Sequence, residues 1–218
     1  GSRVVQRNWT GSHTYTPYID SDNSDRTNDN NHGCHVAGTA AGNRQGWARQ
    51  SNIYNLNPYS SAPTTINSSQ IFDYIRTFHN GKTNGNPTVV NNSWTYVSYN
   101  TFPINQVNYR GTNYYNVNLS DANDYGINHA NSTHWLVQNK ISGVDADIED
   151  CIDDGIIVIG AHGNYNMKIT ANTSDQDYNN YLSDGTVDFY AKGGSPTHSP
   201  GAISVGSVYK AYTGGSSR

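Results

Sequence analysis

The chain has 218 residues, of which 34% are hydrophobic and 14% are charged, and its formal net charge is −4. This length suits one domain with a hydrophobic core and is short for two. Lysine and arginine residues are scattered rather than clustered, which argues against nucleic-acid binding and against attachment to an anionic membrane surface. No apolar run reaches about 18 residues, so the sequence predicts no transmembrane helix.

Residues 3–9 alternate apolar and polar side chains, which predicts a β-strand near the start of the chain. The polar loop expected next, over residues 10–31, contains the aspartates Asp20, Asp22, Asp25 and Asp29. Calcium takes about six to eight oxygen ligands, which such a loop can supply, although this spacing matches no defined calcium-binding loop. A solvated loop and a calcium site both stay open as interpretations.

The segment 31–42 reads Asn-His-Gly-Cys-His-Val-Ala-Gly-Thr-Ala-Ala-Gly and predicts a loop that turns directly into a helix. Asn30 and Asn31 suit the N-cap, and the small, mostly apolar run 36–41 suits a helix packed closely on all sides. His32 then lies in the first turn, where the helix dipole disfavours a protonated imidazole. A neutral imidazole near pH 7 is what a general base requires.

This segment resembles the histidine motif of subtilisin-like serine proteases, His-Gly-Thr-His-Val-Ala-Gly, with Cys34 in place of the usual threonine. The resemblance implies that His32 is the catalytic histidine and that His35 has a structural role within the helix. It also implies the family's α/β fold, a three-layer sandwich with a central, mainly parallel sheet, and hydrolysis of peptide bonds in a polypeptide substrate. Residues 1–218 would then form a partial subtilisin-like domain.

Three further elements follow in order. Residues 52–57 alternate apolar and polar side chains, as a short strand does. Residues 67–81 carry apolar side chains at helical spacing and end on a glycine, which predicts a helix covering one face of a sheet. Residues 87–94 read as a strand that delivers its last residues to a surface cleft.

In the subtilase family the strand corresponding to 87–94 ends in Asn-Met-Ser-Leu-Gly-Gly, and its end pairs with the substrate backbone. The resemblance therefore implies a substrate channel lined by Asn92, Ser93, Trp94 and Thr95. Thr95 and Tyr96 replace the two family glycines, which changes the shape expected of the specificity pocket.

Residues 97–140 are rich in asparagine and tyrosine and show no sustained periodicity, and the family crosses this point with a much shorter connection. We therefore expect a long loop insertion that serves either as a wall of the substrate cleft or as a docking surface for an assembly partner. Tyrosine and tryptophan are common in interfaces, which favours docking. Deletion of such an insertion is expected to leave folding largely intact.

Asp145 is placed to cap a helix that ends at Gly155, and residues 156–160 predict a central parallel strand buried on both faces. The following Ala-His-Gly-Asn, residues 161–164, resembles the family's Ala-Ala-Gly-Asn. The resemblance implies that the Asn164 amide donates a hydrogen bond to the oxyanion, with Gly163 beside the substrate. Residues 199–208 resemble a further strand of the family.

His32 is the only clear member of a catalytic triad, because no family aspartate motif and no Gly-Thr-Ser motif occur in the chain. One interpretation is a segment of a serine endopeptidase whose aspartate and serine lie in flanking sequence, so that these 218 residues alone are inactive. A second is an inactive structural or docking module of a viral particle or surface assembly. A third is a metal site formed by His32, Cys34 and His35, although no further ligand pair lies at useful spacing.

The chain contains two cysteines, Cys34 and Cys151, which are expected to be buried free thiols unless the two helices that carry them touch. Several Asn-x-Ser/Thr sequences would fit an extracellular or virion-associated protein, but they also arise by chance in an asparagine-rich chain. We further expect His32 and Asn164 to face one cleft at the C-terminal edge of the parallel sheet.

Overall fold

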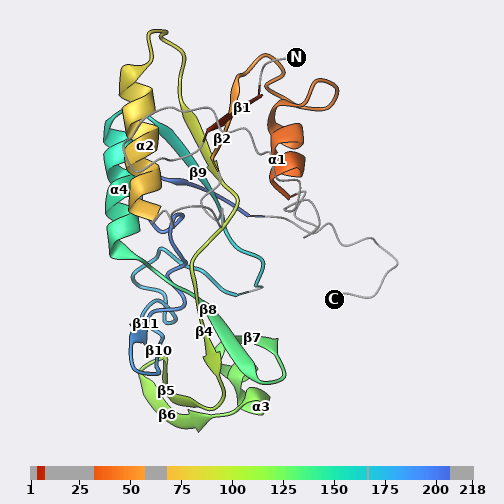
Figure 1. The fold of residues 1–218 in the computed structure, drawn as a ribbon. Coiled ribbons are helices and arrows are strands. Elements are labelled where there is room, and N and C mark those ends of the chain that lie inside the picture. Colours follow the sequence, from red (N-terminus) through yellow and green to blue (C-terminus); the bar gives the residue numbers. More distant parts are fainter. Residues whose placement is uncertain (1–3, 8–31, 57–67, 166, 207–218) are drawn as a thin grey trace. The chain divides into compact units, whose positions relative to one another are not determined.

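The computed structural model describes residues 4–7, 32–56, 68–165 and 167–206 (Figure 1). The chain divides into two compact units, Gly1–Lys82 and Thr83–Arg218. The aspartate-rich loop, with its open calcium interpretation, lies outside the described residues, as do Asn30 and Asn31.

In the first unit, strand β1 (Val4–Arg7) pairs in parallel with strand β2 (Ile53–Leu56). Helix α1 (His32–Ala41) lies between these strands in the sequence, as a parallel pair requires a crossover connection. Both strands fall where the alternation of side chains predicts them.

Helix α2 (Ser68–Gly81) ends at the predicted glycine. Its buried side chains include Phe72 and Ile75, and the ring of Phe78 lies 4.6 Å from the ring of Tyr54 in β2. The predicted helix is therefore confirmed, and its Phe78 ring packs against β2.

The second unit contains a parallel sheet in the order β12-β9-β3. Strand β9 (Ile157–Ala161) is central, between β3 (Val89–Asn92) and β12 (Ile203–Val205), and it follows helix α4 (Ser142–Asp153). Figure 1 shows α4 running alongside β9, which it contacts. Helices and a parallel sheet in one chain confirm the predicted α/β class.

Among the described residues of this unit, one face of this sheet is covered and the other is not. Val158 of β9 is buried, whereas the side chains of the opposite face are largely exposed, including Val89, Ile157 and Ile203. The expectation that β9 is buried on both faces is therefore wrong for the described structure. The buried face lies toward α4, whose Ile148 and Cys151 are fully buried.

Helix α4 begins at Ser142, three residues before the predicted cap, so Asp145 lies in its first turn instead. The side chain of Ile141 makes no capping hydrogen bond. The backbone N–H of Ile141 instead donates to the hydroxyl of Ser195, with an N–O distance of 2.8 Å. A distant side chain thus satisfies a donor at this end, which a local sequence pattern does not reveal.

The segment expected as a long loop folds into strands and short helices. Its elements are β4 (Val97–Thr101), β5 (Ile104–Tyr109), β6 (Thr112–Val117), α3 (Leu119–Ala122), the 3₁₀ helix η2 (Asn123–Tyr125), β7 (Asn128–Asn131) and β8 (His134–Gln138). They form two antiparallel arrangements, β4-β8-β7 and β5-β6, and the second is extended by β10 (Tyr181–Ser183) and β11 (Val187–Asp188). Figure 1 shows β10 and β11 beside β5 and β6.

The side chains of this insertion form part of a hydrophobic core. The buried members are Ile104, Val107, Val117, Ala122, Ile127, Trp135, Val137, Leu182 and Tyr190. Because Leu182 and Tyr190 lie beyond residue 140, the core is shared with the segment after β9. The insertion therefore cannot be removed at 97–140 without uncovering apolar side chains elsewhere, contrary to the expectation that its deletion leaves folding intact.

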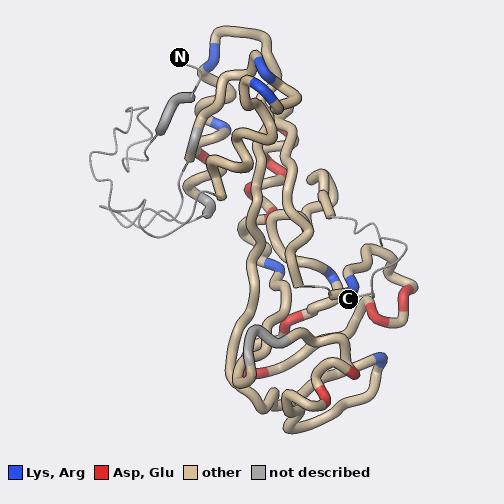
Figure 2. Tube along the Cα trace, turned by 90° about the vertical axis from the view of Figure 1, so that its right-hand side faces the viewer, with Lys and Arg blue, Asp and Glu red and all other residues tan. Residues whose placement is uncertain are grey.

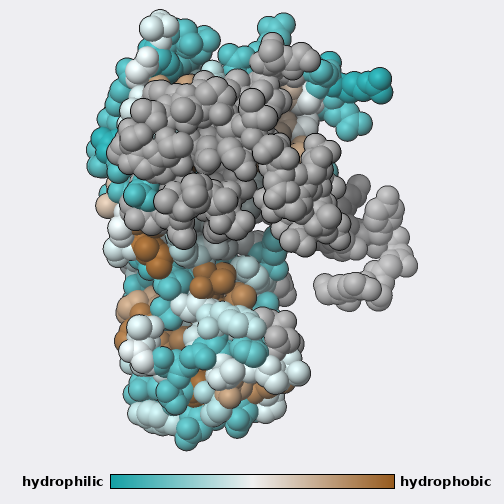
Figure 3. Space-filling model, viewed as in Figure 1, coloured by the Kyte–Doolittle hydropathy of each residue, from teal (hydrophilic) through white to brown (hydrophobic). Residues whose placement is uncertain are grey.

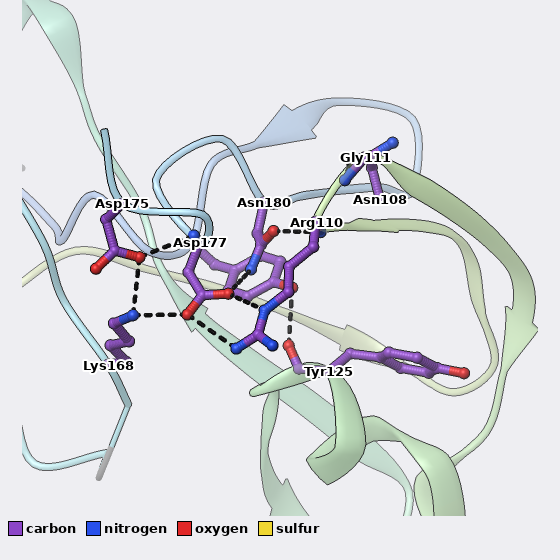
Figure 4. A network of polar contacts seen from close by, with 9 residues as sticks. Asn108, Arg110, Gly111, Tyr125, Lys168, Asp175, Asp177 and Asn180 are labelled. Atoms are coloured by element: carbon purple, nitrogen blue, oxygen red, sulfur yellow. Dashed lines mark hydrogen bonds and ion pairs between the residues drawn. The ribbon is translucent and has the colours of Figure 1, made fainter. Parts of the chain in front are cut away.

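A polar network ties the β5–β6 turn to the segment after β9 (Figure 4). The guanidinium of Arg110 donates to both carboxylate oxygens of Asp177 at 2.7 and 3.3 Å, and Lys168 donates to the same carboxylate at 2.7 Å. Asn180 accepts from the backbone N–H of Arg110 at 2.7 Å, which supports the left-handed backbone of Arg110, at φ 51°. These contacts, first among them the Arg110 hydrogen bond, hold the pKa of Asp177 well below its ordinary value.

The described surface is sparsely charged and mixed. Lysine, arginine, aspartate and glutamate are spread along the described chain in Figure 2, without a long run of one sign. On the face shown in Figure 3, hydrophobic residues are interrupted by hydrophilic ones. Among the described residues, no helix has the length and apolar character needed to cross a bilayer.

Truncating Leu182 to alanine tests whether the insertion core is shared. Leu182 is fully buried, so Leu182→Ala should lower the free energy of unfolding by about 2–5 kcal/mol in urea titrations followed by tryptophan fluorescence. Val187→Ala, on the neighbouring strand and 55% exposed, is the control and should cost less than about 1 kcal/mol. Equal effects of the two substitutions would contradict a core that extends beyond residue 140.

The polar network predicts a dependence of stability on pH. Asp177 titrates lower in the folded than in the unfolded chain, so its stabilisation is present above the unfolded pKa of about 3.9 and is lost as pH falls below it. Asp177→Asn should therefore destabilise the chain at pH 6, and the difference from wild type should shrink toward pH 2.5. Asp124→Asn, an exposed site outside the network, is the control. If the difference in unfolding free energy between Asp177→Asn and wild type stayed constant over this pH range, the proposed dependence on Asp177 ionisation would be ruled out.

Candidate active site

His32 is the first residue of α1, as the sequence predicts. Its side chain is exposed, and so are those of Cys34 and His35. Ala41 is the buried residue of this helix, so the close packing expected on all sides, and a packed structural role for His35, are not seen within the described part of this unit. Glycine and alanine give the helix little apolar area with which to pack on its own.

The chain turns back sharply after α1. Ala48 donates its backbone N–H to the carbonyl of Ala40 at 2.9 Å, and Gly46 donates to Gly42 at 2.9 Å. A β-carbon at Gly46 would lie 2.1 Å from the nitrogen of Gly42, so a larger residue cannot occupy this position without moving the backbone. This turn fixes the C-terminal end of the helix that begins with His32.

Asn164 follows the C-terminal end of β9, and its side chain is exposed. The preceding Gly163 has φ +88°, a left-handed conformation that favours glycine. His162 is held to β12, because its backbone N–H donates to Val205 at 2.9 Å and its Nδ1 lies 2.5 Å from the hydroxyl of Ser204. The candidate oxyanion residue thus stands on a short loop fixed at its base.

The end of β3 carries the residues expected to contact substrate. The Asn92 side chain is buried and donates to the carbonyl of Ile159 at 3.3 Å, so its amide stabilises the sheet. Ser93, Trp94 and Thr95 are partly exposed. The hydroxyl of Ser93 accepts a hydrogen bond from Asn91 at 2.8 Å, and the Trp94 ring packs edge-on against Tyr96 with centroids 5.5 Å apart.

Three segments of the second unit meet beside Thr95. The N–H of Tyr96 donates to Ser195 at 2.9 Å, and the N–H of Asn139 donates to Tyr96 at 2.9 Å. Ser195 in turn donates its N–H to Asn139 at 3.1 Å. A β-carbon at Gly194 would lie 2.6 Å from the Thr95 hydroxyl, so this position requires a residue without a side chain. The end of β3, the end of β8 and the loop around Ser195 are therefore adjacent.

Ser195, Asp145 and His198 form a cluster that no local sequence pattern predicts. The Ser195 hydroxyl donates to one carboxylate oxygen of Asp145 at 2.6 Å, and Nδ1 of His198 lies 3.1 Å from the other. In a catalytic triad the serine hydroxyl contacts the imidazole, whereas here it contacts the carboxylate. Ser195 is also fully buried, so the cluster holds the start of α4 and is not a nucleophilic site.

A buried amide was also missed by the sequence analysis. Gln138, the last residue of β8, is 3% exposed, and its Nε2 donates to the carbonyl of His162 at 2.8 Å. Its Oε1 accepts from the N–H of Gly194 at 2.9 Å. No local pattern marks Gln138, because it lies within the region that we expected to be a loop.

The described residues contain no group of three or more histidine, cysteine, aspartate or glutamate side chains arranged to hold a metal ion. The interpretation of His32, Cys34 and His35 as a metal site therefore has no structural support. Both cysteines are free, but only Cys151 is buried, so the expectation of two buried thiols is half correct.

The packing of the loop that carries Asn164 predicts that alanine substitution costs more stability at Gly163 than at Gly185. A β-carbon at Gly163 would lie 2.6 Å from Nε2 of Gln138, whereas Gly185, with φ +96°, has open space around it. Gly185→Ala should cost about 1 kcal/mol of backbone strain, and Gly163→Ala about 2–4 kcal/mol, because it also displaces a buried hydrogen-bonded amide. Urea titration measures both, and equal costs would show that Gln138 moves aside freely.

Comparison with known proteins adds one finding. The family model for the subtilase family matches residues 3–217. Searches of curated proteins and of solved structures returned no match. A match over nearly the whole length shows that the chain belongs to the subtilase family and carries a serine peptidase-like domain.

Proposed function

We propose that this chain is a segment of a serine endopeptidase domain that hydrolyses peptide bonds, with His32 as the general base and Asn164 as an oxyanion donor. The observation that carries the proposal is the subtilase match over residues 3–217. Two local features support it: His32 begins a helix with its side chain exposed, and Asn164 stands exposed at the C-terminal end of the central strand. Ligands of open α/β folds bind at this end of the strands.

In the proposed reaction, His32 acts on the attacking serine and Asn164 acts on the oxygen of the peptide carbonyl. The imidazole of His32 accepts the proton of a serine hydroxyl as its oxygen attacks the peptide carbon, and then gives that proton to the departing amine. The amide of Asn164 donates a hydrogen bond to the oxygen that becomes negative. Because such a donor stabilises the transition state more than the substrate, it raises kcat.

We propose that the substrate is a polypeptide that pairs with the backbone beyond β3. Ser93, Trp94 and Thr95 would contact this peptide on one side and Gly163 on the other. Asn92 would not contact the peptide but would hold β3 to β9 through its hydrogen bond to Ile159. Thr95 and Tyr96 replace family glycines, and both donate hydrogen bonds to the carbonyl of Ser195. This contact would narrow the specificity pocket and favour small substrate side chains.

The 218 residues alone are proposed to be inactive. Neither the aspartate motif nor the Gly-Thr-Ser motif of the family occurs among them, so His32 has no serine to activate and no carboxylate to fix its tautomer. The cluster of Ser195, Asp145 and His198 does not replace them, because its serine is buried and bonded to the carboxylate. A docking role for residues 97–140 stays a prediction.

A fluorophosphonate probe, which reacts with activated serines, tests the proposal. We expect no labelling of this chain and no release of peptides from casein. A longer form of the protein that includes both missing motifs should be labelled at a serine beyond Arg218, and His32→Ala should slow that labelling by about 10⁴-fold or more. Labelling of a serine within residues 1–218 would contradict the assignment. A longer form that is folded but unlabelled would favour a structural module.

A further inference from the structure

Gln138 is a buried polar side chain whose two ends are both used. A buried amide costs free energy unless its donor and its acceptor are satisfied. Nε2 donates to the carbonyl of His162 at 2.8 Å, and Oε1 accepts from the N–H of Gly194 at 2.9 Å. The orientation of the amide is therefore fixed by its partners, since exchanging its oxygen and nitrogen would oppose like groups at both ends.

The carbonyl of His162 belongs to the peptide group that leads into Gly163. A peptide group is planar, so holding this carbonyl also fixes the direction of the Gly163 N–H. The left-handed turn at Gly163, at φ +88°, then sets where the chain enters Asn164. The turn lies directly on the Gln138 amide, because a β-carbon at Gly163 would approach Nε2 to 2.6 Å.

The second partner, Gly194, lies on the other side of the same amide. Gly194 packs against Thr95, where a β-carbon would be 2.6 Å from the hydroxyl. Through one side chain, Gln138 thus connects the loop before Asn164 with the segment that adjoins the end of β3. Buried hydrogen bonds of this kind define a unique geometry more strictly than apolar packing does.

We propose that Gln138 is a positioning residue for the proposed reaction: it holds the His162–Gly163 peptide so that the amide of Asn164 is fixed before the substrate binds. This inference rests on the proposed role of Asn164. An oxyanion donor is effective when it needs no reorganisation during the reaction, so the residue that holds its loop affects kcat. Gln138 comes from the inserted strand β8, so the insertion contributes to the site directly.

The first test uses the 218-residue chain and backbone order parameters measured by NMR relaxation. In Gln138→Leu the order parameters of Gly163 and Asn164 should fall toward values below about 0.6, which are typical of flexible backbone. Gln106→Leu, on β5 of the same insertion, is the control and should leave these order parameters unchanged. Unchanged order parameters at Gly163 and Asn164 in Gln138→Leu would overturn the proposal.

Gln138→Glu keeps the size of the side chain and the acceptor for Gly194, but an ionised carboxylate cannot donate to His162. The order parameters should therefore fall at Gly163 and Asn164, while hydrogen exchange at Gly194, whose N–H keeps its acceptor, should not rise. As pH falls and the carboxyl binds a proton, its O–H can again donate to His162, so the order parameters should return toward those of wild type. Faster exchange at Gly194 together with a loss of order that does not depend on pH would indicate general destabilisation and contradict the proposal.

The second test uses a longer, active form of the protein and a cycle of two substitutions. Asn164→Ala should lower kcat by about 10²–10³, a range taken from the same donor in subtilisin itself. Gln138→Leu should lower kcat by about tenfold or more, with KM changed less than about threefold, and should have little further effect when Asn164 is already alanine.

The outcomes of the cycle separate the two proposals. An unchanged kcat in Asn164→Ala would refute the proposed function, while the order parameters of Gly163 and Asn164 would still decide whether Gln138 holds the loop. A large effect of Asn164→Ala, together with an independent and additive effect of Gln138→Leu, would refute the positioning role alone. Urea titration of each variant at the assay pH checks that it is folded.

Discussion

The parallel pairing of β9 with β3 and β12 is the constraint on which the site of the second unit depends. Asn92 pairs with Gly160, and Val205 pairs with Ala161, so the three strands reach their carboxyl ends together. Parallel strands place these ends at one edge of the sheet, where open α/β folds bind ligands. The residues that follow β3 and the loop that carries Asn164 therefore emerge at the same edge.

The pairing of β4 with β8 explains how an insertion can follow β3 without separating the ends of the parallel strands. Strand β4 leaves shortly after β3, and β8 returns along it in antiparallel register, so that Val97 pairs with Gln138. The chain thus comes back close to the point where it left, and the core of the insertion lies farther along the strands. The end of β8 is adjacent to the loop that carries Asn164, so a side chain at that end can hold the loop.

The sequence predicted the elements whose signals are local. The start of α1 at His32, the end of α2 at Gly81 and strand β9 follow from caps, glycines and β-branched runs. The insertion was predicted, but its strands were missed because its inward residues do not alternate: Ile104 and Val107 are both buried, three positions apart. Its core also depends on Leu182 and Tyr190, and the cap of α4 on Ser195, 54 residues from Ile141. Such contacts leave no periodic signal.

Burial separates the polar side chains that stabilise the site from those that can take part in chemistry. Ser195 and Gln138 are buried, and each makes two or more hydrogen bonds that would have to break before it could meet a substrate. His32 and Asn164 are exposed, as their proposed roles require. A group that must bind a developing charge needs such access together with a rigid support. In the proposed reaction, Gln138 supplies that support to Asn164 through the peptide group of His162, while the exposed Asn164 amide keeps its access to solvent and substrate.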